Sequence, residues 1–158
     1  MPLIVRPARR SDAKSMSEFL NELIVQGEST AHRQPFNADR IIDSYIDSKL
    51  GICCFSAVDD DEVIGFQALD WADPDWAGPD RLSPDWAIIA TYVAVGRQGK
   101  GVGRKLFAAT RAAARLAGVQ RIDATIRRGN AVGQAYYDRI GFIDYRQGGQ
   151  TISKKFQF

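Results

Sequence analysis

Hydrophobic side chains recur every three or four positions in two stretches near the start of the chain, which is the spacing of amphipathic helices. The first stretch follows Ser11, a residue suited to capping a helix, with Asp12 in the first turn. The second stretch follows Asn37, another capping residue. The apolar positions are Met16, Phe19, Leu20, Leu23 and Ile24 in the first helix, and Ile41, Ile42, Tyr45 and Ile46 in the second. The pattern predicts two helices that each pack one face on a sheet.

Runs of β-branched and aromatic residues predict strands along the rest of the chain. Their ranges are 3–7, 52–58, 63–69, 86–95, 121–127, 142–146 and 151–156. Acidic residues at 59–62 separate the second and third runs and indicate a solvated hairpin turn. Two further helices, over about 101–117 and 130–140, end at Gly118 and Gly141, the usual residue type for a helix C-terminus. The predicted order of elements is βααβββαβαββ, a mixed α/β fold.

The least regular stretch runs from residue 70 to residue 86. It holds three Pro, three Trp and five Asp, which is too broken for a helix and longer than a hairpin needs. Two interpretations stay open for this loop. Its Trp71, Trp76 and Trp86 could line a pocket whose aspartates attract an ammonium group, or the loop could be a surface flap whose tryptophans pack on the core.

Composition narrows the class of protein. The length of 158 residues predicts a single domain over 1–158, and 45% hydrophobic with 25% charged residues is ordinary for a globular chain. No apolar run is long enough to span a membrane and the start has no signal-peptide layout, so a cytoplasmic location without membrane contact is expected. Cys53 and Cys54 are neighbours in a predicted strand and point to opposite faces, so they suggest neither a disulfide nor a metal site.

The net charge of +2 argues against a nucleic-acid partner, but the charges are unevenly distributed. Residues 1–96 hold 8 Lys or Arg and 16 Asp or Glu, whereas residues 97–158 hold 13 and 3. A basic second half suits a polyanionic cofactor, and an acidic first half would favour a cationic amine through its field. Ordinary solvated surface explains the same division equally well.

A glycine-rich turn follows the fourth predicted strand. Glycines at 99, 101 and 103 let the backbone turn tightly, and the helix that follows adds unpaired N–H groups and a positive dipole end. This arrangement predicts a site for an anion such as a phosphate. The turn is not a Walker loop, because Gly103 is followed by Arg104 instead of Lys and then Ser or Thr, and the spacing is not GxGxxG.

Two motifs in this part of the chain resemble those of the GCN5-related N-acetyltransferases. Residues 98–103, Gln-Gly-Lys-Gly-Val-Gly, match the family pattern Gln/Arg-x-x-Gly-x-Gly/Ala, whose loop holds the pyrophosphate of coenzyme A. Residues 130–142 match Asn-x-x-Ala-x-x-x-Tyr-x-x-x-Gly-Phe, with Gly133 where Ala is usual. The predicted order of elements is also that of the family. The resemblance implies the GNAT fold and acetyl-CoA as co-substrate.

The resemblance also implies roles for individual residues. Backbone groups of Tyr92, Val93 and Val95 would pair with the pantetheine arm, and Asn130 would contact it. Tyr137 falls on the motif tyrosine and would protonate the departing thiolate, whereas Tyr136 falls one position short. Main-chain N–H groups of the strand would stabilise the oxyanion. The residues expected to hold the pyrophosphate are Gln98, Gly99, Lys100, Gly101, Val102, Gly103 and Arg104, with Lys100 and Arg104 adding charge.

The general base is where the sequence departs from the family. Many relatives carry a Glu early in the strand before the loop, but here Ala87 or Ile88 falls on that position. The remaining candidates are Asp85, Asp70 and His32, of which only histidine has an ordinary pKa suited to the task. A water molecule held by backbone groups is a further alternative.

The expected reaction is transfer of an acetyl group from acetyl-CoA to a primary amine of a small molecule, such as an amino acid, an amino-acid analogue or a polyamine. By resemblance, the first helix pair and its connection form one wall of the acceptor site. That wall makes Glu28, Ser29, Thr30 and His32 candidates for substrate contact. The alternatives are a protein or peptide N-acetyltransferase and a non-catalytic acyl-CoA sensor. Dimers are common in the family, so a homodimer is left open.

Overall fold

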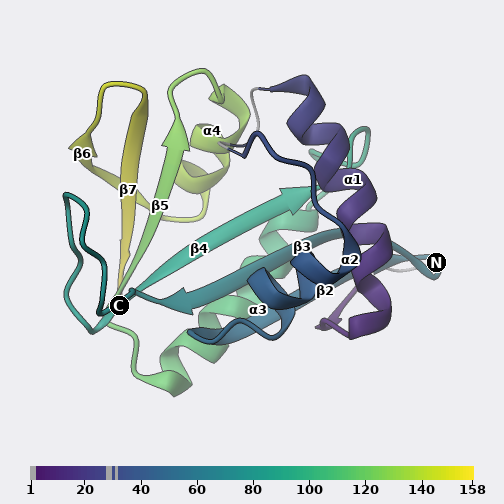
Figure 1. Ribbon diagram of the computed structural model, residues 1–158, viewed down its shortest axis with the longest axis horizontal. Coiled ribbons are helices and arrows are strands. Elements are labelled where there is room, and N and C mark those ends of the chain that lie inside the picture. The colour runs from purple at the N-terminus through teal and green to yellow at the C-terminus, as the bar shows by residue number, and fades with distance from the viewer. Residues whose placement is uncertain (1–2, 28–29, 31) are drawn as a thin grey trace.

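A single mixed sheet organises the structure, a computed structural model that describes residues 3–27, 30 and 32–158 (Figure 1). The strand order is β1-β2-β3-β4-β5-β7-β6, and every neighbouring pair is antiparallel except β4 and β5, which run parallel. The strands are β1 (Ile4–Pro7), β2 (Gly51–Asp59), β3 (Glu62–Trp71), β4 (Trp86–Val93), β5 (Arg121–Arg127), β6 (Ile143–Gln147) and β7 (Thr151–Gln157). The mixed α/β fold and the order of strands and main helices predicted from the sequence are confirmed.

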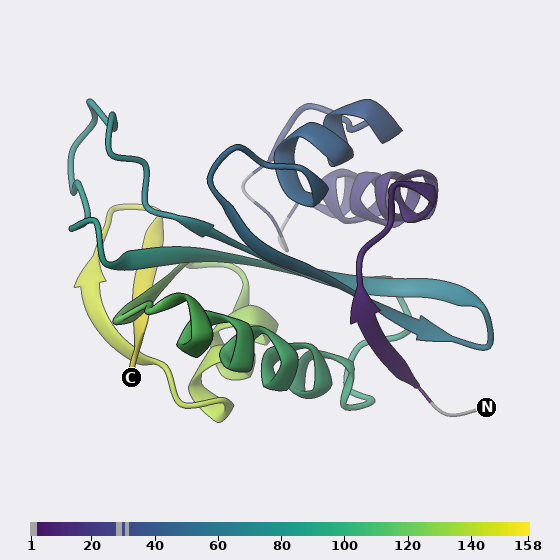
Figure 2. The same cartoon turned by 90° about the horizontal axis from the view of Figure 1, so that it is seen from below.

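Helices cover the two faces of the sheet in separate pairs (Figure 2). On one face lie α1 (Ala13–Gln26) and α2 (Ala38–Ile41), which continues into a π-helical turn, η2 (Ile42–Ile46). On the other face lie α3 (Val102–Ala117) and α4 (Ala131–Arg139). No helix in the described part of the chain is both long enough and apolar enough to cross a membrane.

Each face of the sheet has its own core. Under α1 and α2 the buried cluster consists of Ala13, Met16, Phe19, Leu20, Phe36, Ile41 and Phe66. Under α3 and α4 it includes Leu69, Ile89, Phe107, Ile122, Tyr137 and Phe142. Successive residues of β3 therefore pack on opposite layers, because side chains alternate across a strand. The middle of β3 and β4 therefore lies between the two helical layers. A polar side chain buried there is unfavourable unless it has hydrogen-bond partners.

The start of the first helix differs from the prediction. Ser11 does not cap it but lies inside a short 3-10 turn, η1 (Arg10–Asp12), which precedes α1. Asp12 is the N-cap residue of α1, but its buried carboxylate does not bond to that helix and instead accepts the amide of Arg9, the residue that precedes η1, at 2.9 Å. Two more donors, the Arg6 guanidinium at 2.8 Å and the Ser56 hydroxyl at 2.9 Å, reach the same carboxylate. The sequence pattern located the helix but not the residue that anchors it.

The stretch from residue 70 to residue 86 does not line a pocket, which was one of its two interpretations. Asp70 and Trp71 belong to β3, and residues 73–80 are exposed. Trp76 is 51% exposed and donates to the Pro79 carbonyl within the loop. The structure therefore favours a surface flap, although Trp76 does not pack on the core as that interpretation expected. The fourth strand likewise ends at Val93 instead of residue 95, because the backbone turns at Gly96, whose φ is +82°.

Asp12→Asn is expected to lower the free energy of unfolding by about 2 kcal/mol at pH 7, since hydrogen bonds to a buried charged group contribute roughly that much. Burial alone would raise the pKa of the Asp12 carboxyl, but hydrogen bonds from Arg6, the Arg9 amide and Ser56 bring it below its ordinary value of 3.8. A lowered folded-state pKa means that the stabilisation is present above pH 3.8 and is lost as the pH falls through the folded-state value.

The measurement is urea unfolding of the native protein and the variant at pH 7 and again at successively lower pH. Asp43→Asn, at an exposed position of η2, is the control and should leave the stability within about 0.5 kcal/mol of native. A difference between native and Asp12→Asn that did not shrink at low pH would contradict the ion-pair explanation.

Candidate active site

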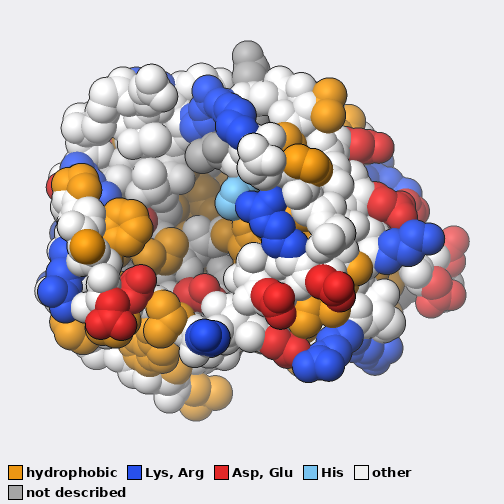
Figure 3. Space-filling model, in the orientation of Figure 1, with side chains coloured by type: hydrophobic (Ala, Val, Ile, Leu, Met, Phe, Trp, Pro, Cys, Tyr) orange, Lys and Arg blue, Asp and Glu red, His pale blue; other side chains and the backbone are white. Residues whose placement is uncertain are grey.

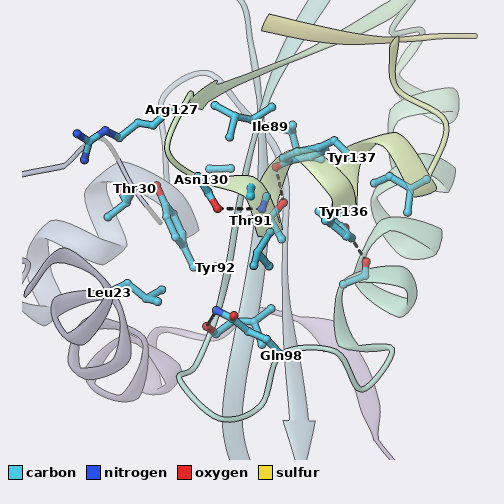
Figure 4. A pocket seen from close by; sticks show the side chains of 18 of the residues that line it. Leu23, Thr30, Ile89, Thr91, Tyr92, Gln98, Arg127, Asn130, Tyr136 and Tyr137 are labelled. Atoms are coloured by element: carbon cyan, nitrogen blue, oxygen red, sulfur yellow. Dashed lines mark hydrogen bonds between the residues drawn. The ribbon is translucent and has the colours of Figure 1, made fainter. Parts of the chain in front are cut away.

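A cleft opens in the sheet where β4 and β5 separate. The two strands pair only at Trp86–Ile88 with Arg121–Asp123, although both continue beyond these residues. A cavity of about 810 Å³ lies between them, lined by both strands, by the glycine-rich turn and by the start of α4 (Figure 4). In the space-filling view this face is hollowed near its centre, with hydrophobic side chains inside the hollow and the only histidine at its edge (Figure 3).

The glycine-rich turn has the conformation that an anion site requires. Gly99 and Gly101 have φ values of +78° and +79°, and nothing lies within 4 Å of the position that a Cβ would occupy. Gly101 is the N-cap of α3, so the unpaired N–H groups of the first turn lie at the cavity wall. Arg104 lines the same wall. The turn therefore fits a pyrophosphate by its open backbone, its helix N-terminus and its positive charge.

The second motif forms the start of α4. Asn130 caps this helix, and its side-chain oxygen accepts the Gly133 amide at 2.8 Å. A Cβ at position 133 would lie 2.5 Å from Asn130 Nδ2, so an alanine here would require the Asn130 side chain to shift. Despite the departure from the family pattern at this position, Asn130 and Gly133 both lie in the cavity wall.

Both motif tyrosines line the cavity, and their hydroxyl groups have different partners. The Tyr137 hydroxyl lies 2.8 Å from Thr91 Oγ1 on β4. The Tyr136 hydroxyl donates to the Gly103 carbonyl at 2.7 Å. Burial raises the pKa of Tyr136 to about 12 and raises the pKa of Tyr137 well above its usual range. Both phenols are therefore protonated at neutral pH, which is the state that an acid needs.

The other end of the cavity is built from the helical layer of α1 and α2. Leu23 and Thr30 line it together with His32 and Tyr92. His32 Nε2 lies 2.9 Å from the Tyr45 hydroxyl, and burial together with the charge of Arg40 lowers the pKa of this imidazole. Two other substrate-contact candidates from the sequence, Glu28 and Ser29, lie outside the described residues.

Most of the predicted cofactor residues line this one cavity. Those that do are Tyr92, Val93, Gln98, Gly99, Gly101, Val102, Gly103, Arg104, Asn130 and Tyr137. Val95 and Lys100 are exposed in the turn and are not among the lining residues. The structure thus assembles the two motifs, about thirty positions apart in the chain, around a common space.

The predicted aspartates lie elsewhere. Asp85 is exposed in the turn before β4, and Asp70 accepts the Ser48 hydroxyl at 2.9 Å, with its pKa raised by burial. Neither of them lines the cavity. Of the three base candidates from the sequence, only His32 does.

A carboxylate that the sequence analysis missed lies close to the position of the absent family glutamate. The register of β4 and β5 pairs Asp123 with Ile88. Asp123 is 4% exposed and accepts the Tyr145 hydroxyl at 2.5 Å and the Thr125 hydroxyl at 3.0 Å. Thr125 itself lines the cavity. Burial raises the pKa of Asp123, although these two hydrogen bonds act in the opposite direction. Only the strand register reveals this residue.

Comparisons with known proteins agree with this geometry. A model of the acetyltransferase (GNAT) family matches residues 17–142. No curated protein matches the sequence. Among solved structures, yncA of Salmonella typhimurium, which holds acetyl-CoA, superposes with a TM-score of 0.82 at 21% identity, over 98% of this chain and 93% of that one.

Two further structures show how varied the relatives of this fold are. The paiA N-acetyltransferase of Thermoplasma acidophilum, in complex with coenzyme A, gives a TM-score of 0.77 at 18% identity, with 100% of both chains covered. The ribosomal-protein-alanine N-acetyltransferase of Brucella melitensis gives 0.76 at 18% identity, over 98% of this chain and 99% of that one. With the family match over most of its length, the chain belongs to the acetyltransferase (GNAT) family and is an N-acetyltransferase that uses acetyl-CoA.

Proposed function

We propose that the chain acetylates a primary amine of a small molecule, such as an amino acid, an amino-acid analogue or a polyamine. The observation that carries this proposal is a bridge at the acceptor end of the cavity. Arg127 of β5 lines the cavity, and its guanidinium donates a hydrogen bond to the carbonyl of Gly27, the C-cap residue of α1. A side chain that joins the two walls narrows the opening, which suits a small acceptor better than an extended polypeptide.

The alternative is acetylation of a protein or peptide. The Brucella relative is named for such an acceptor, so the fold accommodates both classes. A polypeptide needs a groove that is open along its length, and the bridge from Arg127 to Gly27 would have to open for it. The homodimer stays open, and the roles of the individual cofactor residues remain predictions.

The chemistry requires a proton donor for the sulfur and a proton acceptor for the amine. We assign the first role to Tyr137, because its protonated hydroxyl group lines the cavity on the cofactor side. The amine nitrogen bonds to the carbonyl carbon, the carbon–sulfur bond breaks, and the sulfur takes the proton of Tyr137. The tyrosine regains a proton from the nitrogen through solvent. Main-chain N–H groups of β4 that face the cleft would stabilise the oxyanion.

For the proton of the acceptor ammonium we assign Asp123, acting through Thr125. The Thr125 hydroxyl donates to Asp123, and its oxygen, which also lies 2.9 Å from Ser153 Oγ, has a second lone pair that can accept a hydrogen bond from the ammonium group. The proton then passes along the hydroxyl to the carboxylate and on to solvent. His32 is the second candidate, but its Nε2 is already engaged with Tyr45.

The decisive test is the release of free thiol from acetyl-CoA in the presence of amino acids, amino-acid analogues, polyamines or short peptides, with cofactor binding measured in parallel by calorimetry. We expect turnover with a small amine at least about tenfold above that with any peptide. Faster turnover with a peptide would establish the alternative acceptor class. Tight binding of acetyl-CoA without turnover across the panel would contradict the proposed acceptor class.

A further inference from the structure

A buried amide lies at the centre of the sheet beside the motif tyrosines. Gln67 of β3 is fully buried, and its strand partner on β4 is Thr91. Gln67 Nε2 lies 2.9 Å from Thr91 Oγ1 and 3.0 Å from the Tyr136 hydroxyl oxygen. A polar side chain at such a position costs free energy unless its hydrogen bonds are made. Gln67 therefore calls for an explanation beyond packing.

The direction of these hydrogen bonds is fixed at one end by a carbonyl group. The Gly103 carbonyl can only accept, so the Tyr136 hydroxyl must donate to it and has no second proton. The Tyr136 oxygen consequently accepts from Gln67, which requires the nitrogen of the amide to face it. The reverse orientation would bring two acceptors together. The amide nitrogen then also donates to Thr91, while Gln67 Oε1 has no partner among the described residues.

Thr91 is the next member of the chain. Its oxygen accepts from Gln67, and its single proton is available for the Tyr137 oxygen at 2.8 Å. Thr91 also lies near the Tyr136 hydroxyl, but that oxygen already accepts from Gln67. Donation from Thr91 leaves the Tyr137 proton unclaimed by this network and free to enter the cavity.

We infer that Gln67 and Thr91 are positioning residues, which form a one-way chain of hydrogen bonds from Gln67 through Thr91 to the oxygen of Tyr137. The Gly103 carbonyl fixes the orientation of the Gln67 amide at the start of this chain. The chain acts when Tyr137 gives up its proton. A hydrogen bond donated to the phenol oxygen becomes stronger as negative charge develops there, so it favours transfer of the proton to the thiolate. This inference rests on the proposed acid role of Tyr137.

The opposite direction of the bond between Thr91 and Tyr137 has the opposite consequence. If Tyr137 donated to Thr91, the acid proton would be held back, and removal of the threonine hydroxyl would release it. Thr91→Val would then leave kcat unchanged or raise it. Under the inferred direction the same substitution lowers kcat, because the phenolate loses its donor. The sign of the effect therefore distinguishes the two arrangements.

The test measures kcat, KM for acetyl-CoA and the dissociation constant of CoA for Thr91→Val, Gln67→Met and the control Thr91→Ser, which keeps a hydroxyl group. Turnover is followed with the best acceptor of the amine panel, or as acetyl-CoA hydrolysis if no acceptor is active. We expect kcat to fall about tenfold or more in Thr91→Val and about threefold in Gln67→Met. Thr91→Ser should stay within about threefold of native, and the dissociation constant of CoA should change less than about twofold.

Thr91→Val and Gln67→Met are then each combined with Tyr137→Phe. If they act through the Tyr137 oxygen, they should have no further effect there, whereas loss of fold or of packing would lower activity in both backgrounds. Retained kcat in Thr91→Val, or a loss that persists in the Tyr137→Phe background, would overturn the inference while leaving the acid role intact. Retained kcat in Tyr137→Phe alone would remove the acid role and the chain with it.

Discussion

Tyr137→Phe should lower kcat roughly a hundredfold and leave the dissociation constant of CoA within about twofold of native. General acid catalysis contributes about 10²–10⁴ in rate, and the change removes one hydroxyl group that lines the cavity. Phenylalanine keeps the ring contacts with Phe142, whose centroid lies 5.0 Å away. The measurement is steady-state kinetics with the best amine acceptor, together with calorimetry for CoA binding.

Tyr136→Phe is the matched control for this prediction. Tyr136 is the adjacent aromatic residue and lines the same cavity, but its proton is held by the Gly103 carbonyl. The control should lose less than about tenfold in kcat. A larger loss of kcat in Tyr136→Phe than in Tyr137→Phe would assign the acid role to Tyr136. It would also show that the position in the family motif identifies the wrong tyrosine.

Asp123→Asn should lower kcat/KM for an amine acceptor roughly a hundredfold at pH 7, because a Lys-like amine with a pKa of about 10.4 is then almost entirely protonated. Since burial raises the pKa of Asp123, the carboxylate is a better proton acceptor than an exposed aspartate. The loss should shrink as the pH approaches about 10, where the amine is neutral without assistance. The measurement is the pH profile of kcat/KM from pH 6 to about 10.

Two other aspartates serve as controls for Asp123. Asp85→Asn changes an exposed carboxylate, and Asp70→Asn changes one that is bound to Ser48 and does not line the cavity. Both should keep native kcat/KM within about twofold at every pH. A pH-independent loss in Asp123→Asn would indicate a structural defect, and a larger loss in His32→Gln than in Asp123→Asn would transfer the role to the histidine.

The sequence predicted the fold well because its signals are local. Helical spacing, strand runs and the glycines that end helices depend on near neighbours, and the order of strands and main helices followed from them. The glycine-rich turn was found for the same reason, because the positive φ values at Gly99 and Gly101 require that residue type. The predicted cap at Ser11 was wrong, because residues 10–12 form a 3-10 turn before α1. The Asp12 carboxylate holds this turn through four hydrogen bonds from Arg6 on β1, the Arg9 amide and Ser56 on β2.

The polar residues of the site were harder to predict. Gln67, Thr91 and Asp123 lie inside runs whose neighbours are apolar, so each is a single interruption in a strand pattern. Their importance arises from strand pairing, which brings Gln67 opposite Thr91 and Asp123 beside Ile88. Pairing between distant segments leaves no periodic signal in one sequence. The sequence showed that β4 lacks the family glutamate, but it did not show that Asp123 of the neighbouring strand β5 lies beside that position.

The separation of β4 and β5 has a consequence for stability. In backbone pairing the sheet is two smaller sheets, β1–β4 and β5–β7–β6, joined by only three residue pairs. Beyond this joint the facing edges of both strands have no partner strand among the described residues, and the angle between the two halves sets the width of the cleft. A ligand that hydrogen-bonds to either edge holds the two halves at one angle. Because it binds only the folded state, it stabilises that state by RT ln(1 + [L]/Kd), where [L] is the free ligand concentration. With the proposed binding of acetyl-CoA along β4, the thermal stability of this enzyme is expected to rise with the concentration of its own acetyl donor.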